Sequence, residues 1–171
     1  SGAGNDTIIA GNGDDLIDAD GGNDSIIAGH GLNTITGGAG TDTMIGGNGD
    51  DLFYFGNGEF ITNEVVNGRL GTDTVQLTAD SQTITDANFA HKSNLEVIIT
   101  ANGANNLTLG TAAGLATENL SVFGGTGNDS VNAGSLGDAV YIDAGDGRNR
   151  LTGSVQNDTI ISGTGLSLIH I

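Results

Sequence analysis

Large apolar residues recur at every ninth position over the first third of the chain. Residues 1–54 divide without a gap into six nonapeptides, SGAGNDTII, AGNGDDLID, ADGGNDSII, AGHGLNTIT, GGAGTDTMI and GGNGDDLFY. The eighth position holds Ile8, Ile17, Ile26, Ile35, Met44 and Phe53. Because side chains alternate across a strand, the pattern predicts short strands in which position 8 faces inward while positions 7 and 9 face outward. Each strand would then contribute one side chain to a narrow core.

Glycine and acidic residues mark the segments between these strands. Glycine stands at position 4 of all six units and at position 2 of five, where Asp20 is the departure, and it adopts backbone conformations closed to residues with a β-carbon. Position 6 holds Asp6, Asp15, Asp24, Asn33, Asp42 and Asp51. A short carboxylate beside glycine either bonds its own turn or binds a metal ion. Asp14, Asp18 and Asp50 fall outside this column, and we interpret them as solvated surface charge.

These columns spell GGxGxDxUx, with U a large apolar residue, and the six units resemble the hemolysin-type calcium-binding (RTX) repeat family. The resemblance implies an all-β fold, a right-handed parallel β-roll or β-solenoid with two nonapeptides to each coil. Loops 18 residues apart would stack on one edge, which groups Asp6, Asp24 and Asp42 on a first edge and Asp15, Asn33 and Asp51 on a second. Because the amide of Asn33 has no charge, we expect the second edge to bind more weakly. The implied calcium ligands are the position-6 side chains, with loop backbone at Gly2, Gly4, Gly11, Gly13, Gly22, Gly29, Gly31, Gly38, Gly40, Gly47 and Gly49.

The strict period lapses in residues 55–123, where apolar patches every 9 to 13 residues predict a less regular solenoid segment. The stretches 85–93 and 110–118 are expected to form brief helical turns. A second, degenerate block follows in residues 124–170, interrupted by two inserted residues after residue 141. Its candidate ligands are Asp129, Asp138 and Asp158, with loop backbone at Gly125 and Gly127. Because several of its loops lose the glycine or the acid, part of this block is expected to be a calcium-free spacer.

The charge of the chain narrows the choice of partners. Twenty-one acids against four Lys and Arg give a net charge of −17, which argues against nucleic acid and anionic membranes and calls for a cationic partner. Oxygen donors without any cysteine favour Ca²⁺ over Zn²⁺, and Mg²⁺ holds its waters too firmly to suit a loose site. Because the narrow core buries little and the acids repel one another, we predict that residues 1–54 stay largely unfolded without a divalent cation. No apolar run approaches the length of a membrane span.

No catalytic motif occurs in the sequence, so the predicted function is a non-catalytic calcium-binding module of a secreted or cell-surface protein, adhesin-, S-layer- or toxin-like. Export through a type I secretion system is implied by the resemblance. Two alternatives remain: a module that binds a glycan, ice or a partner protein through a flat outer face, and an accessory module of a secreted enzyme. Ile9, Ile27 and Ile45 would form an exposed ladder on such a face. We expect the irregular middle segment to dock on this ladder, and an external partner is the other possibility.

Overall fold

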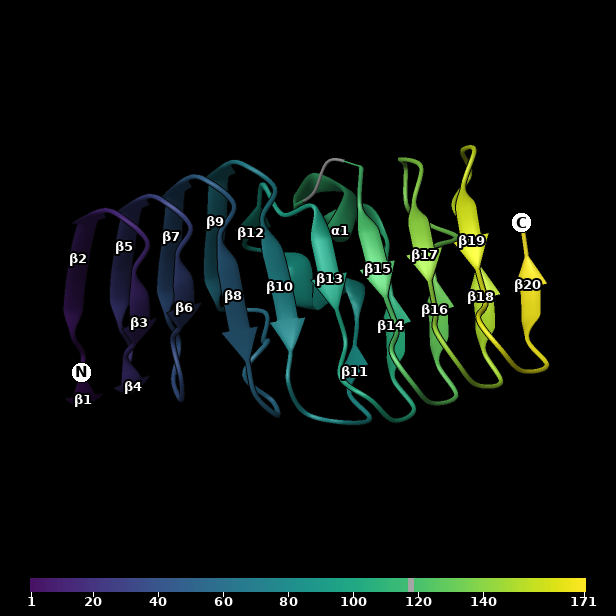
Figure 1. Ribbon diagram of the computed structural model, residues 1–171, viewed down its shortest axis with the longest axis horizontal. Coiled ribbons are helices and arrows are strands. Elements are labelled where there is room, and N and C mark those ends of the chain that lie inside the picture. Colours follow the sequence, from purple (N-terminus) through teal and green to yellow (C-terminus); the bar gives the residue numbers. More distant parts are fainter. Residues whose placement is uncertain (117–118) are drawn as a thin grey trace.

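The chain forms an elongated, nearly all-β solenoid of about eight turns, with the termini at opposite ends (Figure 1). The computed structural model describes residues 1–116 and 119–171. Every strand pair in these ranges is parallel, which confirms the predicted fold class. No helix in the described ranges is long and apolar enough for a membrane span.

One sheet runs the whole length of the molecule, and we call it the continuous sheet. In spatial order it contains β3 (Leu16–Asp18), β6 (Thr34–Thr36), β8 (Leu52–Phe55), β10 (Thr74–Leu77), β13 (Val97–Ile99), β15 (Ser121–Phe123), β17 (Tyr141–Asp143) and β19 (Thr159–Ile161). The N-terminal sheet contains β2 (Thr7–Asn12), β5 (Ser25–His30), β7 (Thr43–Asn48), β9 (Val65–Leu70) and β12 (Lys92–Ser93). The C-terminal sheet contains β11 (Thr83–Ile84), β14 (Asn106–Thr108), β16 (Ser130–Asn132), β18 (Arg150–Thr152) and β20 (Leu168–His170), and a small sheet pairs β1 (Gly2–Ala3) with β4 (Asp20–Gly21).

The register of the first coils follows the nonapeptide period. Ile8 pairs with Ile26 and Ile26 with Met44, so residues 18 apart stack directly, as the sequence predicts. The position-8 side chains from Ile17 to Phe53 are buried, and only Ile8, at the end of the stack, is partly exposed. The inward prediction for position 8 is therefore confirmed.

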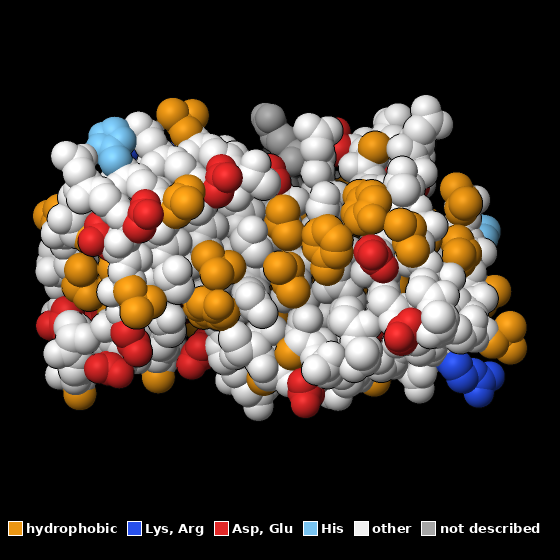
Figure 2. Space-filling model, viewed as in Figure 1, with side chains coloured by type: hydrophobic (Ala, Val, Ile, Leu, Met, Phe, Trp, Pro, Cys, Tyr) orange, Lys and Arg blue, Asp and Glu red, His pale blue; other side chains and the backbone are white. Residues whose placement is uncertain are grey.

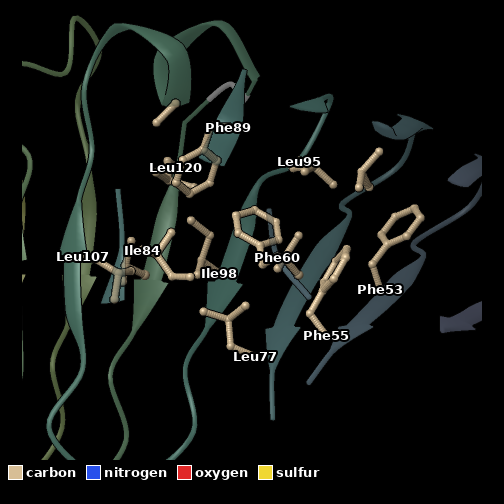
Figure 3. Close-up of a cluster of buried hydrophobic side chains, with 14 of the residues drawn as sticks. Phe53, Phe55, Phe60, Leu77, Ile84, Phe89, Leu95, Ile98, Leu107 and Leu120 are labelled. Atoms are coloured by element: carbon tan, nitrogen blue, oxygen red, sulfur yellow. The ribbon is translucent and has the colours of Figure 1, made fainter. Parts of the chain in front are cut away.

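The middle coils are longer and hold a wider core (Figure 3). The rings of Phe55 and Phe60 meet edge to face at 5.0 Å, and those of Phe60 and Phe89 at 5.2 Å. These coils contain the short 3₁₀ helix η1 (Asp86–Phe89) and the helix α1 (Thr111–Ala116). Both fall in the stretches expected to be helical, although residues 117–118 of the second stretch lie outside the described residues.

The N-terminal sheet ends where α1 packs against η1 and β12. The Asp86 carboxylate accepts hydrogen bonds from the backbone N–H groups of Gly110 and Ala113 at 2.9 and 3.0 Å, so α1 is capped by a residue far from it in sequence. Beyond this point the C-terminal sheet faces the continuous sheet in place of the N-terminal one.

The middle segment continues the solenoid and does not cover the isoleucine ladder. Ile9 pairs with Ile27 and Ile27 with Ile45 on the outer side of the N-terminal sheet. Ile9 is 70% exposed and Ile27 is 40% exposed. The expected docking of residues 55–123 on this ladder is therefore wrong, because these residues stack on the end of the sheet rather than on its face.

Candidate metal centre

A first row of acidic side chains runs along the loops that precede the N-terminal sheet. It consists of Asp6, Asp24, Asp42 and Glu64. The backbone N–H of Asp6 donates to Oδ1 of Asp24 at 2.7 Å, and the N–H of Asp24 donates to Oδ1 of Asp42 at 2.8 Å. The N–H of Asp42 then reaches both carboxylate oxygens of Glu64 at 3.1 Å. Each acid thus bonds the loop of the preceding coil.

A second row follows the same rule along the loops that precede the continuous sheet. It consists of Asp15, Asn33, Asp51, Asp73 and Glu96, joined by N–H to side-chain oxygen bonds of 3.0, 2.9, 2.8 and 2.7 Å. The amide of Asn33 also donates from Nδ2 to Oδ1 of Asp51 at 2.8 Å. Asn33 therefore donates to the Asp51 carboxylate from both its backbone and its side chain, without adding a negative charge to the row.

A third row, along the loops before the C-terminal sheet, is mostly neutral: Gln82, Asn105, Asp129, Asn149 and Ser167. Its amides show where the loop carbonyls point. Nδ2 of Asn105 donates to the carbonyls of Ala101 and Gly103, at 2.8 and 3.2 Å, and Nδ2 of Asn149 donates to the carbonyl of Gly145 at 3.0 Å. In these two loops the backbone oxygens thus converge on the position-6 side chain, and an amide N–H satisfies them.

An aspartate at the same position has no side-chain N–H that could donate to such carbonyls. Accordingly, one carboxylate oxygen is buried without a hydrogen-bond partner in each of Asp15, Asp24, Asp51, Asp73 and Asp129. Buried polar atoms are nearly always paired, so each of these oxygens signals a missing partner. A cation is one partner that would satisfy such an oxygen together with the loop carbonyls, because neither of these groups can donate a hydrogen bond.

The buried acids of the rows have raised pKa values. Burial is the largest cause in every case: it raises the pKa of Asp73 and of Glu64 to about 7, and it raises those of Asp42, Asp51 and Asp129. Neighbouring acids add to the shift, Asp51 and Glu96 for Asp73, and Asp42 for Glu64. Without a cation, the rows of carboxylates are therefore costly to keep ionised.

The donor set fits calcium. Ca²⁺ takes six to eight oxygens from carboxylates and backbone carbonyls in flexible geometry. No three His, Cys, Asp or Glu side chains gather into a metal cluster within residues 1–116 and 119–171, so carbonyls have to supply much of the coordination. The loops stack closely enough for this, because a Cβ added at Gly40 would lie 1.7 Å from the carbonyl oxygen of Gly22.

The loop glycines predicted from the sequence have the backbone conformation that favours glycine. All thirteen glycines named in the sequence analysis have positive φ angles. Asp20 and Arg69, which stand where the pattern has glycine, also adopt positive φ, 69° and 78°. The departure at Asp20 thus keeps its loop geometry, since Asp20 pairs with Gly2 in the small sheet.

Asp14 and Asp50 do more than carry surface charge. Oδ1 of Asp14 accepts from the N–H of Leu32 at 2.8 Å, and Oδ1 of Asp50 accepts from the N–H of Thr72 at 2.7 Å. These position-5 side chains bond the following coil, whereas position-6 side chains bond the preceding one. Both side chains are exposed, as their interpretation as surface charge requires, and each also accepts this one hydrogen bond.

The second block needs a correction of register. The inserted residues lie within the loop before β17, so the backbone N–H that meets Oδ1 of Asp158 belongs to Val140, at 3.0 Å. Asp138 is exposed and lies outside the row. The carboxylate of Asp158 is also bonded by the backbone and hydroxyl of Ser154, at 2.7 and 2.6 Å, so it caps its own loop.

Three acidic row members escaped the sequence analysis, Glu64, Asp73 and Glu96, as did the neutral members of the third row. Asp73 had a signal, because GRLGTD at 68–73 keeps glycine at position 4 and aspartate at position 6. Glu64 and Glu96 follow no glycine motif, and they join the rows across 22 and 23 residues rather than 18.

The chain is thus a parallel β-solenoid of stacked repeats whose loops carry rows of buried acids. The family model of the RTX calcium-binding nonapeptide repeat matches in four copies, at residues 1–31, 27–59, 121–138 and 141–166. These matches cover more than half of the chain, which therefore belongs to this family of calcium-binding repeats. Comparisons with curated proteins and with solved structures give no significant match.

Proposed function

We propose that this chain is a non-catalytic structural module that folds when it binds extracellular Ca²⁺. The observation that carries the proposal is the set of buried carboxylate oxygens without partners on the first and second rows. Calcium held between the stacked loops would satisfy these oxygens together with the loop carbonyls. It would also remove the repulsion within each row, so that binding and folding become one event.

The ligands we propose on the first row are Asp6, Asp24 and Asp42; Glu64 ends this row and is not one of them. On the second row they are Asp15, Asn33 and Asp51, extended by Asp73 and Glu96. In the second block only Asp129 keeps a buried oxygen without a partner. Because amides and Ser154 satisfy the other loops there, residues 124–170 would depend on calcium less than residues 1–54, and this supports a division into 1–54, 55–123 and 124–170.

The experiment is far-ultraviolet circular dichroism of the chain in chelator, calcium and magnesium, with bound calcium counted by equilibrium dialysis. We expect sheet signal to rise with calcium in the millimolar range typical of extracellular modules, about 10⁻⁴ to 10⁻³ M, and to rise little with magnesium. Full sheet signal in chelator, unchanged by calcium, would overturn the proposal.

This behaviour suits a secreted or cell-surface protein of adhesin, S-layer or toxin type. In a cytoplasm with little free calcium the chain would stay loose enough to pass a type I export channel, and it would fold outside. Whether it serves a larger enzyme as an accessory module depends on the neighbouring segments of its parent protein.

A second candidate function is ligand binding through an outer sheet face. The ladder of Ile9, Ile27 and Ile45 on the N-terminal sheet favours it. Ile9 and Ile27 are exposed and Ile45 is partly exposed, and contiguous apolar surface usually marks a contact. On the continuous sheet, Phe123 and Tyr141 lie with ring centroids 5.8 Å apart, and hydrophobic side chains form a band across the middle of the face seen in Figure 2.

The test of this second function uses the calcium-loaded chain and the triple variant Ile9→Thr, Ile27→Thr, Ile45→Thr. Self-association by sedimentation and binding to glycans and ice are measured for both proteins. We expect the variant to lose the interaction. Equal self-association and equal calcium-saturated stability of the two proteins would remove the ladder as an interaction surface.

A further inference from the structure

Of the four Lys and Arg residues in the chain, Lys92 alone is buried. It lies on β12 at an inward position, paired with Val66, and is 4% exposed, whereas Arg69, Arg148 and Arg150 are exposed. An ammonium group in a core is costly unless hydrogen bonds and an opposite charge compensate it. Its position therefore needs a reason.

The ammonium is held by the loop that carries the last acid of the first row. Nζ of Lys92 donates to the carbonyl oxygens of Ile61 and Glu64, at 2.5 and 2.8 Å, and lies 5.0 Å from the centre of the Phe60 ring. The charge of Lys92 also acts on the Glu64 carboxylate, which is 1% exposed. Lys92 thus binds loop carbonyls beside a buried acid, which is the environment we propose for calcium elsewhere.

The pattern of the row changes at this point. In the earlier coils, the carbonyl of the position-6 residue accepts a backbone N–H from the next coil, as when Thr43 donates to Asp24 and Val65 donates to Asp42, at 2.8 and 2.9 Å. The coil after Glu64 has η1 in place of a glycine loop on this edge, and the Glu64 carbonyl accepts from the Lys92 ammonium instead. The following coil therefore has no glycine loop that could complete a calcium site with Glu64.

We infer that the Lys92 ammonium is a resident cation that ends the calcium row of the first edge. It supplies at Glu64 the positive charge that calcium supplies between the earlier loops. The last coil of this edge therefore folds without a metal ion. The inference rests on the proposed function. The second row ends differently, because its last acid, Glu96, is half-buried whereas Glu64 is 1% exposed.

As a consequence, one end of the calcium-dependent row is already folded before calcium binds. The coil that holds Lys92 packs against the aromatic cluster of Phe55, Phe60 and Phe89. This coil would provide a preformed surface on which the calcium-dependent coils stack, so loss of the charge should raise the calcium concentration that the N-terminal coils need.

The experiment compares Lys92→Met, which keeps an unbranched side chain one atom shorter, with Arg69→Met, which removes an exposed charge from the neighbouring coil. Calcium titrations are followed by circular dichroism on the full chain. We expect the folding midpoint of Lys92→Met to rise about fivefold to tenfold, where tenfold corresponds to 1.4 kcal/mol, and that of Arg69→Met to stay within about twofold of the original chain.

The double variant Glu64→Gln, Lys92→Met separates charge balance from packing. If Lys92 balances Glu64, removal of the acid restores most of the midpoint and rescues folding where the single variant fails to fold. A double variant as impaired as Lys92→Met would overturn the inference, and so would equal midpoints for Lys92→Met and Arg69→Met. Absence of any calcium response in the original chain would instead overturn the proposed function, and this inference with it.

Discussion

Replacement of Asp73 by asparagine should change the stability of the fold in opposite directions with and without calcium. Asp73 is fully buried; its Oδ1 accepts the N–H of Asp51 at 2.8 Å, and its other oxygen has no partner. Asparagine keeps the accepting oxygen and removes the charge. It would also gain a donor toward the next acid of the row, as Nδ2 of Asn33 reaches Asp51 at 2.8 Å.

The size of the effect follows from the raised pKa of Asp73, about 7 against an ordinary 3.8. Each pKa unit corresponds to about 1.4 kcal/mol, so ionised Asp73 costs the calcium-free fold up to about 4 kcal/mol above pH 7. This cost shrinks as pH falls through 7 and is absent below the ordinary pKa of the unfolded chain. We therefore expect Asp73→Asn to stabilise the calcium-free chain by about 2 to 4 kcal/mol at pH 8.

In calcium the same substitution removes a charged ligand from the second row. We expect the calcium midpoint of folding to rise roughly tenfold or more, since loss of even outer partners of metal ligands costs about 10- to 100-fold in affinity. The assay is circular dichroism at pH 8: the folded fraction is measured in chelator and across a calcium titration, and urea unfolding is followed at saturating calcium. Asp50→Asn is the matched control, because Asp50 is an exposed acid one residue before the row.

Two results would refute this reasoning. If Asp73→Asn were less stable than the original chain in chelator, the buried carboxylate would not be the uncompensated charge that its raised pKa indicates. If its calcium midpoint matched that of Asp50→Asn, Asp73 would not be a ligand.

Three further predictions use the same measurements. In chelator the original chain should hold more sheet at pH 5 than at pH 8, because buried acids such as Glu64, with a pKa near 7, favour the protonated folded state; equal signal at both pH values would contradict this. In calcium titrations, Asp24→Ala should raise the midpoint more than Asp15→Ala, since Asp24 lies between two acids whereas Asp15 has Asn33 as its neighbour, and equal shifts would remove the inequality of the two edges. In thermal unfolding with calcium, Gly47→Ala should cost several kcal/mol more stability than Gly2→Ala. Both glycines have positive φ, but a Cβ at Gly47 would lie 1.7 Å from a carbonyl oxygen of the preceding coil, whereas one at Gly2 meets open space. Similar losses of stability in the two variants would assign the whole effect to backbone strain.

The nonapeptide period by itself determined the regular part of the fold. It predicted the strands, the inward side chain at position 8 and the stacking of residues 18 apart, because each of these follows from a short pattern repeated in register. It also predicted the two rows as far as Asp42 and Asp51, since constant spacing carries the position-6 residue to the same edge in every coil.

Only the tertiary structure decided where the rows end. Coils of 22 to 24 residues no longer keep a fixed spacing, so stacking of the backbone determines which side chain meets the preceding loop. For this reason Glu64 and Glu96 join the rows without a motif, and Val140 rather than Asp138 takes the position opposite Asp158. Lys92 reaches the end of the first row from 28 residues away. A local pattern fixes contacts between equal repeats, whereas contacts between unequal coils depend on how the whole chain packs.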